Sequence, residues 1–393
     1  MADASVILAL LSLAIWLVLF FGRGDFWKAD QRLAPELPSS GTSFSVRVAS
    51  VVPARDEEDS IGRALGSLLA QTGVTLTTVL VDDHSRDRTR AIAEELVAGS
   101  DGRLVVTGTA PLPPGWSGKL WALDEGIRRA ELAVPDTDHL LLTDADIELG
   151  PDTVRRLLAK AVRDDLDLVS LMVELDHRGP WARLLIPAFV FFFQKLYPFR
   201  WVNDPRRGTA AAAGGCVLVR RTALERIGGI AAIRGALIDD CALAAAVKRS
   251  GGRIWLGLAD SAWSLRDNRS LSSVWSMVAR TAYTQLDHAP LQLIGAMLGM
   301  AVTYLVPPLA VLTWPLHGST VAALAGAAAW ALMAVSFRPT LRLYGQPAAL
   351  GALLPLAGLL YSLMTLDSAI RHWRGRGGRW KGRTYPAPDR PSA

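Results

Sequence analysis

The sequence predicts a soluble α/β domain accompanied by membrane-spanning helices, and three observations lead to this fold class. Three apolar runs each end in acidic residues, at 50–58, 77–85 and 139–146. Amphipathic helical patterns alternate with these runs, which is typical of a parallel sheet with helices on both faces. Half of the 393 residues are hydrophobic, and the longest apolar stretches lie towards the two ends of the chain.

The N-terminal apolar run, residues 5–21, predicts an uncleaved membrane anchor over residues 1–22. Arg23, Lys28 and Arg32 follow the run, and no small-residue cleavage motif precedes them. A secretory signal peptide, the alternative, has its positive charges first and its cleavage site last. Because basic residues favour the cytoplasmic side, we expect the chain after the anchor to be cytoplasmic.

Residues 44–290 hold most of the charge and are expected to form the soluble domain. Apolar residues at helical spacing predict four helices there, at 56–72, 87–99, 118–132 and 150–162. A further apolar stretch within 181–201 carries Lys195, Arg200 and several aromatic residues, which indicates a helix at the membrane interface. A buried core helix fits its short length equally well.

Three apolar stretches, at 291–314, 321–337 and 347–366, predict a membrane region over 291–370, followed by a basic tail over 371–393. If the soluble domain is cytoplasmic, three crossings place the basic tail outside, against the positive-inside tendency. One of the three stretches is therefore a candidate re-entrant or interfacial hairpin. The prolines at 307, 308 and 355 are compatible with this but do not show which stretch it is.

The net charge of +5 does not indicate nucleic-acid binding, because much of the basic excess lies in residues 371–383. A lipid-facing cytoplasmic tail is the simpler interpretation. The two cysteines, Cys216 and Cys241, have no spacing typical of a disulfide framework or a metal site. We therefore expect the soluble domain to face a reducing compartment.

Acidic residues at the ends of the apolar runs predict one acidic site, because ligands of open α/β sheets bind at the carboxyl ends of the strands. Asp144 and Asp146 follow the third run. At this spacing in an extended segment, both carboxylates point to the same side and reach one metal ion. Clustered carboxylates repel one another, and a hard cation such as Mg²⁺ or Mn²⁺ shared with phosphate oxygens relieves that repulsion.

For two other acidic pairs, a purely structural role is the alternative to a role in the site. Asp82 and Asp83 follow the second run, where the structural alternative is a cap for the next helix. Asp239 and Asp240 open a predicted helix, where acids also stabilise the helix dipole. The functional interpretation of Asp240 is a general base facing the acidic site.

The ordered motifs resemble those of the inverting GT-A glycosyltransferases of family 2. More narrowly, they resemble the hopanoid-biosynthesis-associated membrane glycosyltransferases, with ceramide glucosyltransferase as a more distant relative. The resemblance covers residues 45–290 and extends into the tail at GGRWKGRTY. Its blocks, in order, are VPARDEE, VDDHS, GKLWALDEG, TDAD, AGGCVLVRRTALERIGG and DDCAL. The resemblance implies a GT-A fold with a Rossmann-like mixed sheet and a nucleotide-diphospho-sugar donor.

The resemblance also implies roles for the donor-binding residues. Lys119 matches a basic residue near the donor diphosphate. Asp144 and Asp146 match the paired acids of which one reaches the donor and the other the divalent cation. The residues matching the nucleotide-contacting blocks are Pro53, Arg55, Asp56, Asp83, which contacts a uracil-type base, and its neighbour Asp82.

On the acceptor side, Asp240 matches the catalytic base, and Asp239 stands where the family has Glu. A further family block, Q-x-x-R-W, falls on residues 277–281, where Arg280 matches the arginine but Met277 and Thr281 replace Gln and Trp. These replacements argue against polymer synthesis. Arg280 is expected to pair with the leaving diphosphate, or alternatively with lipid headgroups.

The resemblance implies an inverting transfer of a sugar from a UDP-sugar, and the predicted membrane segments indicate a hydroxyl of a membrane lipid as the acceptor. We expect a multi-pass protein of the inner cell membrane with a cytoplasmic catalytic domain. An NAD-dependent oxidoreductase would need a G-x-G-x-x-G turn, which VVPARDEEDSIG lacks. A non-catalytic membrane scaffold that retains a degenerate GT-A domain is the remaining alternative.

Overall fold

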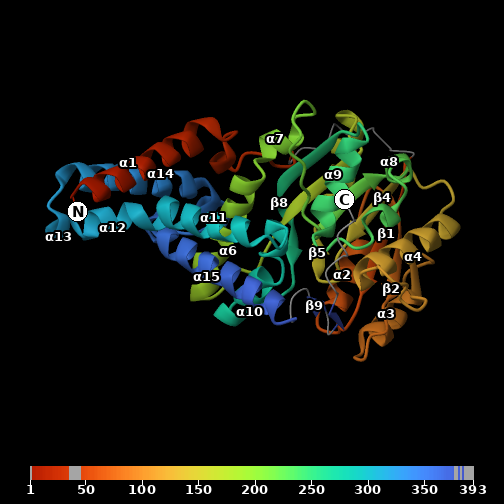
Figure 1. The fold of residues 1–393 in the computed structure, drawn as a ribbon. Coiled ribbons are helices and arrows are strands. Elements are labelled where there is room, and N and C mark those ends of the chain that lie inside the picture. The colour runs from red at the N-terminus through yellow and green to blue at the C-terminus, as the bar shows by residue number, and fades with distance from the viewer. Residues whose placement is uncertain (1, 35–45, 376–378, 381–382, 385–393) are drawn as a thin grey trace, which may run out of the picture. The chain divides into compact units, whose positions relative to one another are not determined.

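The computed structural model describes residues 2–34, 46–375, 379–380 and 383–384. The chain divides into two compact units, which the chain enters and leaves several times. Among the described residues, the sheet unit contains 30–34, 46–175 and 201–266, and the helical unit contains 2–29, 176–200 and 267–375. Figure 1 shows the elements of both units.

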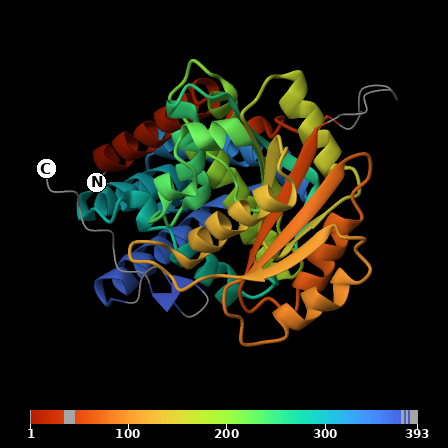
Figure 2. The same cartoon turned by 90° about the vertical axis from the view of Figure 1, so that its right-hand side faces the viewer.

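The sheet unit is built on one eight-stranded sheet with the strand order β3-β2-β1-β4-β7-β6-β8-β5. The three apolar runs of the sequence form three adjacent strands of it, β2, β1 and β4, which Figure 2 shows edge to edge with β3. The strands are β1 (Arg47–Ala54), β2 (Thr75–Asp82), β3 (Leu104–Gly108), β4 (His139–Thr143), β5 (Ile147–Leu149), β6 (Leu168–Glu174), β7 (Cys216–Arg220) and β8 (Ile254–Ser264).

The sheet is mixed, as the GT-A resemblance implied. The alternation of strands and helices alone had predicted a wholly parallel sheet, and this prediction is wrong. β1 pairs in parallel with β2 and β4, but β4 pairs antiparallel with β7, and β5 pairs antiparallel with β8. Only three residues separate β4 from β5, too few for the crossover that a parallel neighbour requires. β7 follows β6 after a long excursion through the helical unit and not after one crossover helix.

Helices cover both faces of the parallel half of the sheet. Val52 and Leu80 point to the face covered by α2, whose Ile61, Leu65 and Leu68 belong to the same buried cluster. On the opposite face, α4 lies so close to the sheet that a side chain at Gly126 would overlap with Val51 and Val81. The helices and helical turns of this unit are α2 (Ile61–Leu69), α3 (Thr89–Val97), α4 (Gly118–Ala133), α5 (Thr153–Arg163), α8 (Arg221–Arg226), η2 (Ile230–Ile233) and α9 (Asp239–Arg249), with α7 (Phe199–Asn203) at the boundary.

The helical unit contains four segments that are long and apolar enough to cross a membrane, at Ala4–Gly22, Pro290–Leu312, Thr320–Leu343 and Ala348–Trp373. They coincide with the expected anchor and with the three expected C-terminal stretches. The elements of the unit are α1 (Ala2–Gly22), η1 (Phe26–Lys28), α6 (Pro180–Leu196), α10 (Leu271–Ala279), η3 (Thr284–Leu286), α11 (Pro290–Met300), η4 (Ala301–Leu305), α12 (Val306–Leu312), α13 (Trp314–His317), α14 (Thr320–Leu343), η5 (Ala348–Leu353) and α15 (Leu354–Trp373).

A π-helical turn, η4, interrupts the segment 290–312 directly before Pro307 and Pro308. Proline has no N–H to donate and its ring crowds the preceding turn, so a wider turn at this point relieves the clash. The two prolines are therefore accommodated within the helical segment without ending it.

The apolar stretch within 181–201 forms α6, which belongs to the helical unit. The Tyr361 hydroxyl donates a 2.9 Å hydrogen bond to the carbonyl of Leu185, and Phe191 packs on Phe337 with 5.2 Å between ring centroids. Apolar side chains of α6 thus bury against apolar helices. Residues 267–290 belong to the helical unit as well, while 44–45 and most of the expected tail at 371–393 lie outside the described residues.

Candidate active site

The start of α4 places one lysine among the acids that follow the strands. Ser117 caps the helix, and its hydroxyl accepts a hydrogen bond from the amide of Leu120. Lys119 therefore stands in the first turn of a helix that the close contact at Gly126 holds against β1 and β2. This anchoring fixes the direction in which the Lys119 side chain extends.

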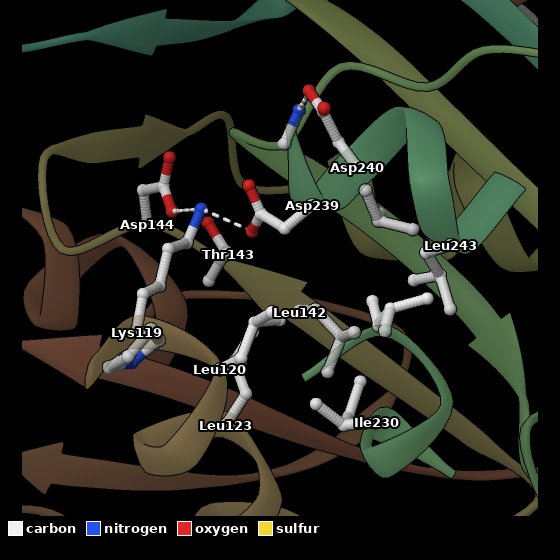
Figure 3. Close-up of a pocket in the computed structure, with 14 residues that line it drawn as sticks. Lys119, Leu120, Leu123, Leu142, Thr143, Asp144, Ile230, Asp239, Asp240 and Leu243 are labelled. Carbon is white, nitrogen blue, oxygen red and sulfur yellow. Dashed lines mark hydrogen bonds and ion pairs between the residues drawn. The ribbon is translucent and has the colours of Figure 1, made fainter. Parts of the chain in front are cut away.

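Lys119 bridges two of the predicted site residues. Its Nζ lies 2.8 Å from Oδ1 of Asp144, after β4, and 3.0 Å from Oδ2 of Asp239, at the start of α9 (Figure 3). Burial lowers the pKa of Lys119, but the carboxylates of Asp144 and Asp239 more than reverse this and leave the pKa raised. The ammonium thus stays charged and ties the end of β4 to the start of α9.

Asp144 and Asp146 lie in a turn and not in the extended segment that the sequence suggested. The amide of Ile147 donates to the carbonyl of Asp144 at 3.3 Å, so the chain reverses directly after β4. Asp144 meets Lys119, whereas Asp146 Oδ2 lies 3.4 Å from Nε of Arg266. Burial and the negative charge of Asp144 raise the pKa of Asp146 to about 6.

Asp240 is held by two backbone amides. Its Oδ2 accepts from Gly214 at 2.8 Å and its Oδ1 from Cys241 at 2.7 Å. Burial and the adjacent charge of Asp239 raise the pKa of Asp240 to about 6, although Lys119 and the two N–H donors oppose the shift. Ile238 occupies the N-cap position of α9, so Asp240 is not the cap residue, although it does accept one amide of the first turn.

These groups line one cavity with about 350 Å³ of empty space open to solvent. Its polar side consists of Lys119, Thr143, Asp144, Asp239 and Asp240, and the other labelled side chains in Figure 3 form an apolar wall. The remaining lining residues are Pro53, Leu120, Leu123, Leu142, Gly214, Val217, Ile230, Ile233 and Leu243. One ammonium group and three carboxylates therefore lie at the edge of a largely apolar cavity.

The acids after β2 form a separate buried cluster with Arg55. Nη1 of Arg55 donates to the carbonyl of Asp83 at 2.5 Å and lies 3.4 Å from its Oδ2, while Thr109 donates to Oδ1 at 3.2 Å. Asp82 Oδ1 accepts from the amide of Ser85 at 3.3 Å. Neither acid caps α3, whose N-cap residue is Arg88, so the capping alternative is wrong for this pair.

Asp56 lies in a strained loop beside this cluster. Its φ is 52°, in the left-handed region, and φ of His84 in the facing loop is 56°. The Asp56 carboxylate accepts from the amide of Arg86 at 2.8 Å, and the Asp56 amide donates to the Ser85 hydroxyl at 3.0 Å. The loops after β1 and β2 are thus fastened to each other by these reciprocal bonds.

The described residues contain no group of three or more His, Cys, Asp or Glu side chains placed to hold a metal ion. Asp144 and Asp146 nevertheless suit a hard divalent cation, because Mg²⁺ is usually held by one or two carboxylates and completed by phosphate oxygens and water. The negative charge of Glu57 also acts on Asp146 and raises its pKa. Added positive charge between these carboxylates would relieve their mutual repulsion.

The structure thus brings Pro53, Lys119, Asp144, Asp239 and Asp240 to one cavity. Arg280 belongs to the helical unit, and its expected pairing with diphosphate stays a prediction.

Sequence reasoning missed Arg266 and the Gly214 amide. Arg266 lies two residues after the end of β8, and Gly214 lies in the AGG motif two residues before β7. These positions next to strand ends are the sequence features that could have identified both residues.

Comparisons with known proteins agree with this geometry. Residues 46–287 match the family described as "Glycosyltransferase like family 2". The succinoglycan biosynthesis protein ExoO of Rhizobium meliloti (strain 1021) is 32% identical over 161 residues, which are 36% of this chain and 41% of that protein. The chain therefore matches about two-fifths of the length of this relative.

A solved structure extends the likeness in fold to almost the whole chain. The mannosyltransferase PcManGT from Pyrobaculum calidifontis, in complex with GDP-Man and Mn²⁺, superposes with a TM-score of 0.56 over 95% of this chain and 99% of that one. The sequence identity is 19%, so this likeness concerns the fold alone.

Proposed function

The chain belongs to glycosyltransferase like family 2, and from this premise we propose that it moves a sugar from a nucleotide-diphospho-sugar to a hydroxyl group of a membrane lipid, with inversion at the anomeric carbon. The observation that carries the proposal is the cavity in which Lys119 joins Asp144 to Asp239 beside the half-buried carboxylate of Asp240. It combines a fixed cation for a diphosphate with a candidate base in one place.

The donor, in this proposal a UDP-sugar, binds along the ends of β1, β2 and β4. Asp83 and its neighbour Asp82 lie at the base end, next to Arg55 and Asp56 in the fastened loops. Pro53 and Lys119 line the cavity where the diphosphate and sugar would lie. Asp144 and Asp146 would hold a Mg²⁺ or Mn²⁺ ion, which would contribute positive charge to the leaving diphosphate.

Asp240 serves as the general base. It takes the proton of the acceptor hydroxyl, and the hydroxyl oxygen attacks the anomeric carbon as the bond from that carbon to the diphosphate oxygen breaks. A pKa near 6 leaves Asp240 mostly ionised at neutral pH yet more basic than an ordinary aspartate. Asp239 is already paired with Lys119, so it positions the lysine and is the weaker candidate for the base.

The acceptor is proposed to be a membrane lipid, because apolar helices long enough to cross a bilayer accompany the sheet unit in the same chain. We place the protein in the inner cell membrane as a multi-pass protein with its sheet unit in the cytoplasm, where nucleotide sugars are available. An amphiphilic polyol such as a hopanoid side chain fits the narrower family resemblance. Arg280 then assists the departure of the diphosphate.

Nucleotide binding by the purified full-length protein tests the donor side. Titration calorimetry with UDP, GDP and NAD, each with and without Mg²⁺, should show cation-dependent binding of UDP. Binding of GDP in place of UDP would change the donor class. Preferential binding of NAD would point to an oxidoreductase, and binding of none of the three would favour a membrane scaffold.

A further inference from the structure

Contacts inside the helical unit define which ends of its helices lie together. At one end, Ala9 of α1 packs with Ala310 of α12 and with Ala322 and Ala325 at the start of α14. Figure 1 shows the N-terminus next to α12 and α13 at this end, which we call the distal end. α1 and α14 therefore run in the same direction, away from the distal end, and the segment 290–312 runs towards it.

The opposite end holds the connections to the sheet unit, and we call it the linker end. Nη1 of Arg200 lies 3.0 Å from Oδ2 of Asp25, just after α1. His177 packs on Tyr344, the residue after α14, with 5.1 Å between ring centroids. The segments before α6 and before α10 meet where a side chain at Gly179 would contact Arg269.

The last apolar segment turns back before it reaches the distal end. Nε1 of Trp330 donates to the carbonyl of Ala352 at 3.1 Å, and Gly351 lies directly against the backbone of Ala334. Trp330 and Ala334 come 10 and 14 residues after Thr320, the first residue of α14. At 1.5 Å per helical residue, the turn at η5 therefore stays roughly 15–20 Å short of the distal end.

The second arm of this hairpin, α15, ends where α11 begins. Gly358 lies against Tyr304 in the middle of the segment 290–312. Near its last residues, His372 stacks on His288 at 4.1 Å, and the Ser368 hydroxyl accepts from the amide of Tyr283 at 3.0 Å. α15 thus runs antiparallel to the segment 290–312 and returns to the linker end.

The basic residues follow the same division. The first basic residue of the chain is Arg23, and no lysine or arginine occurs between Arg280 and Arg338 or between Arg342 and Arg371. The distal end and the turn of the hairpin are therefore free of lysine and arginine, whereas arginines flank the hairpin on both sides at the linker end. Basic residues collect on the cytoplasmic side of membrane proteins.

We propose that residues 345–373 form a re-entrant hairpin, so that the chain crosses the bilayer three times and its basic tail emerges on the side from which the sheet unit is connected. The length and composition of Ala348–Trp373 alone would permit a crossing, but its two ends lie at one end of the helical unit. The first arm of the hairpin, the short 3-10 helix η5, packs against α14, which protects its backbone from lipid. This arrangement removes the conflict between three C-terminal crossings and a cytoplasmic tail.

Thiol labelling of the full-length protein tests the proposal. In a Cys241→Ser background, in which the remaining Cys216 is buried, single variants Leu316→Cys, Arg269→Cys and Arg374→Cys are exposed to a membrane-impermeant maleimide on intact spheroplasts and on inverted vesicles. Leu316, 83% exposed in α13, marks the distal end, and Arg269 marks the linker end. Arg374→Cys should label from the same side as Arg269→Cys, and labelling from the side of Leu316→Cys would overturn the proposal.

A cross-linking measurement checks the same geometry without membrane sidedness. The pair His288→Cys and His372→Cys should be joined by a short bismaleimide in membranes, since the native rings stack on each other. The control pair Leu316→Cys and His372→Cys should not be joined. Cross-linking of the control pair, with none in the His288 and His372 pair, would place the end of α15 at the distal end and refute the hairpin.

Discussion

Replacing Asp240 by asparagine separates catalysis from structure at the proposed base. The carboxylate accepts hydrogen bonds from the Gly214 and Cys241 amides, and an asparagine oxygen can keep one of them while its NH₂ group cannot accept the other. Losing one such bond costs about 1 kcal/mol of stability. Burial already disfavours the charged carboxylate, as its raised pKa shows, so removing the charge offsets part of that cost.

We therefore expect Asp240→Asn to fold with nearly wild-type stability and to bind UDP normally, but to turn over roughly 10²- to 10⁴-fold more slowly, the usual contribution of a positioned general base. The assay is initial-rate transfer of radiolabelled sugar, with thermal unfolding and UDP titration on the same preparation. Asp165→Asn is a matched control, because Asp165 is exposed and pairs with Arg220 outside the cavity. A folded Asp240→Asn enzyme with wild-type turnover would move the base elsewhere, with Asp239 as the next candidate.

Three further predictions follow from the same cavity. Because the pKa of Asp240 is raised to about 6 and only its ionised form accepts a proton, kcat/KM should fall tenfold per pH unit well below pH 6; a flat profile from pH 7 to 5 would contradict this. EDTA should abolish transfer and Mg²⁺ or Mn²⁺ should restore it, whereas full activity in EDTA would rule out a cation at Asp144 and Asp146. Lys119→Met removes contacts to two carboxylates and a cation for the diphosphate, so KM for the donor should rise roughly 10- to 100-fold. Lys160→Met, which breaks an ion pair outside the cavity, should leave that KM unchanged.

The sequence was informative where function lies at the ends of strands. Apolar runs that end in acids are a local pattern, and they located Asp83, Asp144 and Asp146 together with the strands that carry them. Lys119, in contrast, was identified by the family resemblance of the GKLWALDEG block. Parallel strands bring their carboxyl ends to one edge of a sheet, but of these three acids only Asp144 lines the cavity, and Asp83 lies in a separate cluster with Arg55.

Partners distant in sequence were not predictable in this way. Asp146 and Arg266 are 120 residues apart, and their contact depends on the antiparallel pairing of β5 with β8. The Gly214 amide reaches Asp240 only because β7 enters the sheet against the direction of β4. Strand order and direction depend on tertiary packing, which hydrophobic periodicity along one chain does not encode.

The membrane region shows the same limit. Length and apolar composition identified four segments, and charge counting showed that three C-terminal crossings conflict with a cytoplasmic tail. Neither could indicate which segment to propose as the re-entrant hairpin, because that proposal rests on contacts such as that of Trp330 with Ala352. The placement of α6 has a similar origin: it belongs to the helical unit although the family match over 46–287 includes it, and an apolar helix of 17 residues suits a soluble core and a membrane-associated bundle equally well.

The most direct test of the central claim is transfer itself. The detergent-purified full-length protein is incubated with a panel of radiolabelled nucleotide sugars, Mg²⁺ and extracted membrane lipids, and the organic phase is counted beside the same reaction with Asp240→Asn. With the wild-type enzyme, we expect one UDP-sugar to label a lipid, and we expect this label to be lost in the variant. Label that enters only water-soluble products, or lipid label that persists at the wild-type rate in a folded Asp240→Asn protein, would contradict this expectation.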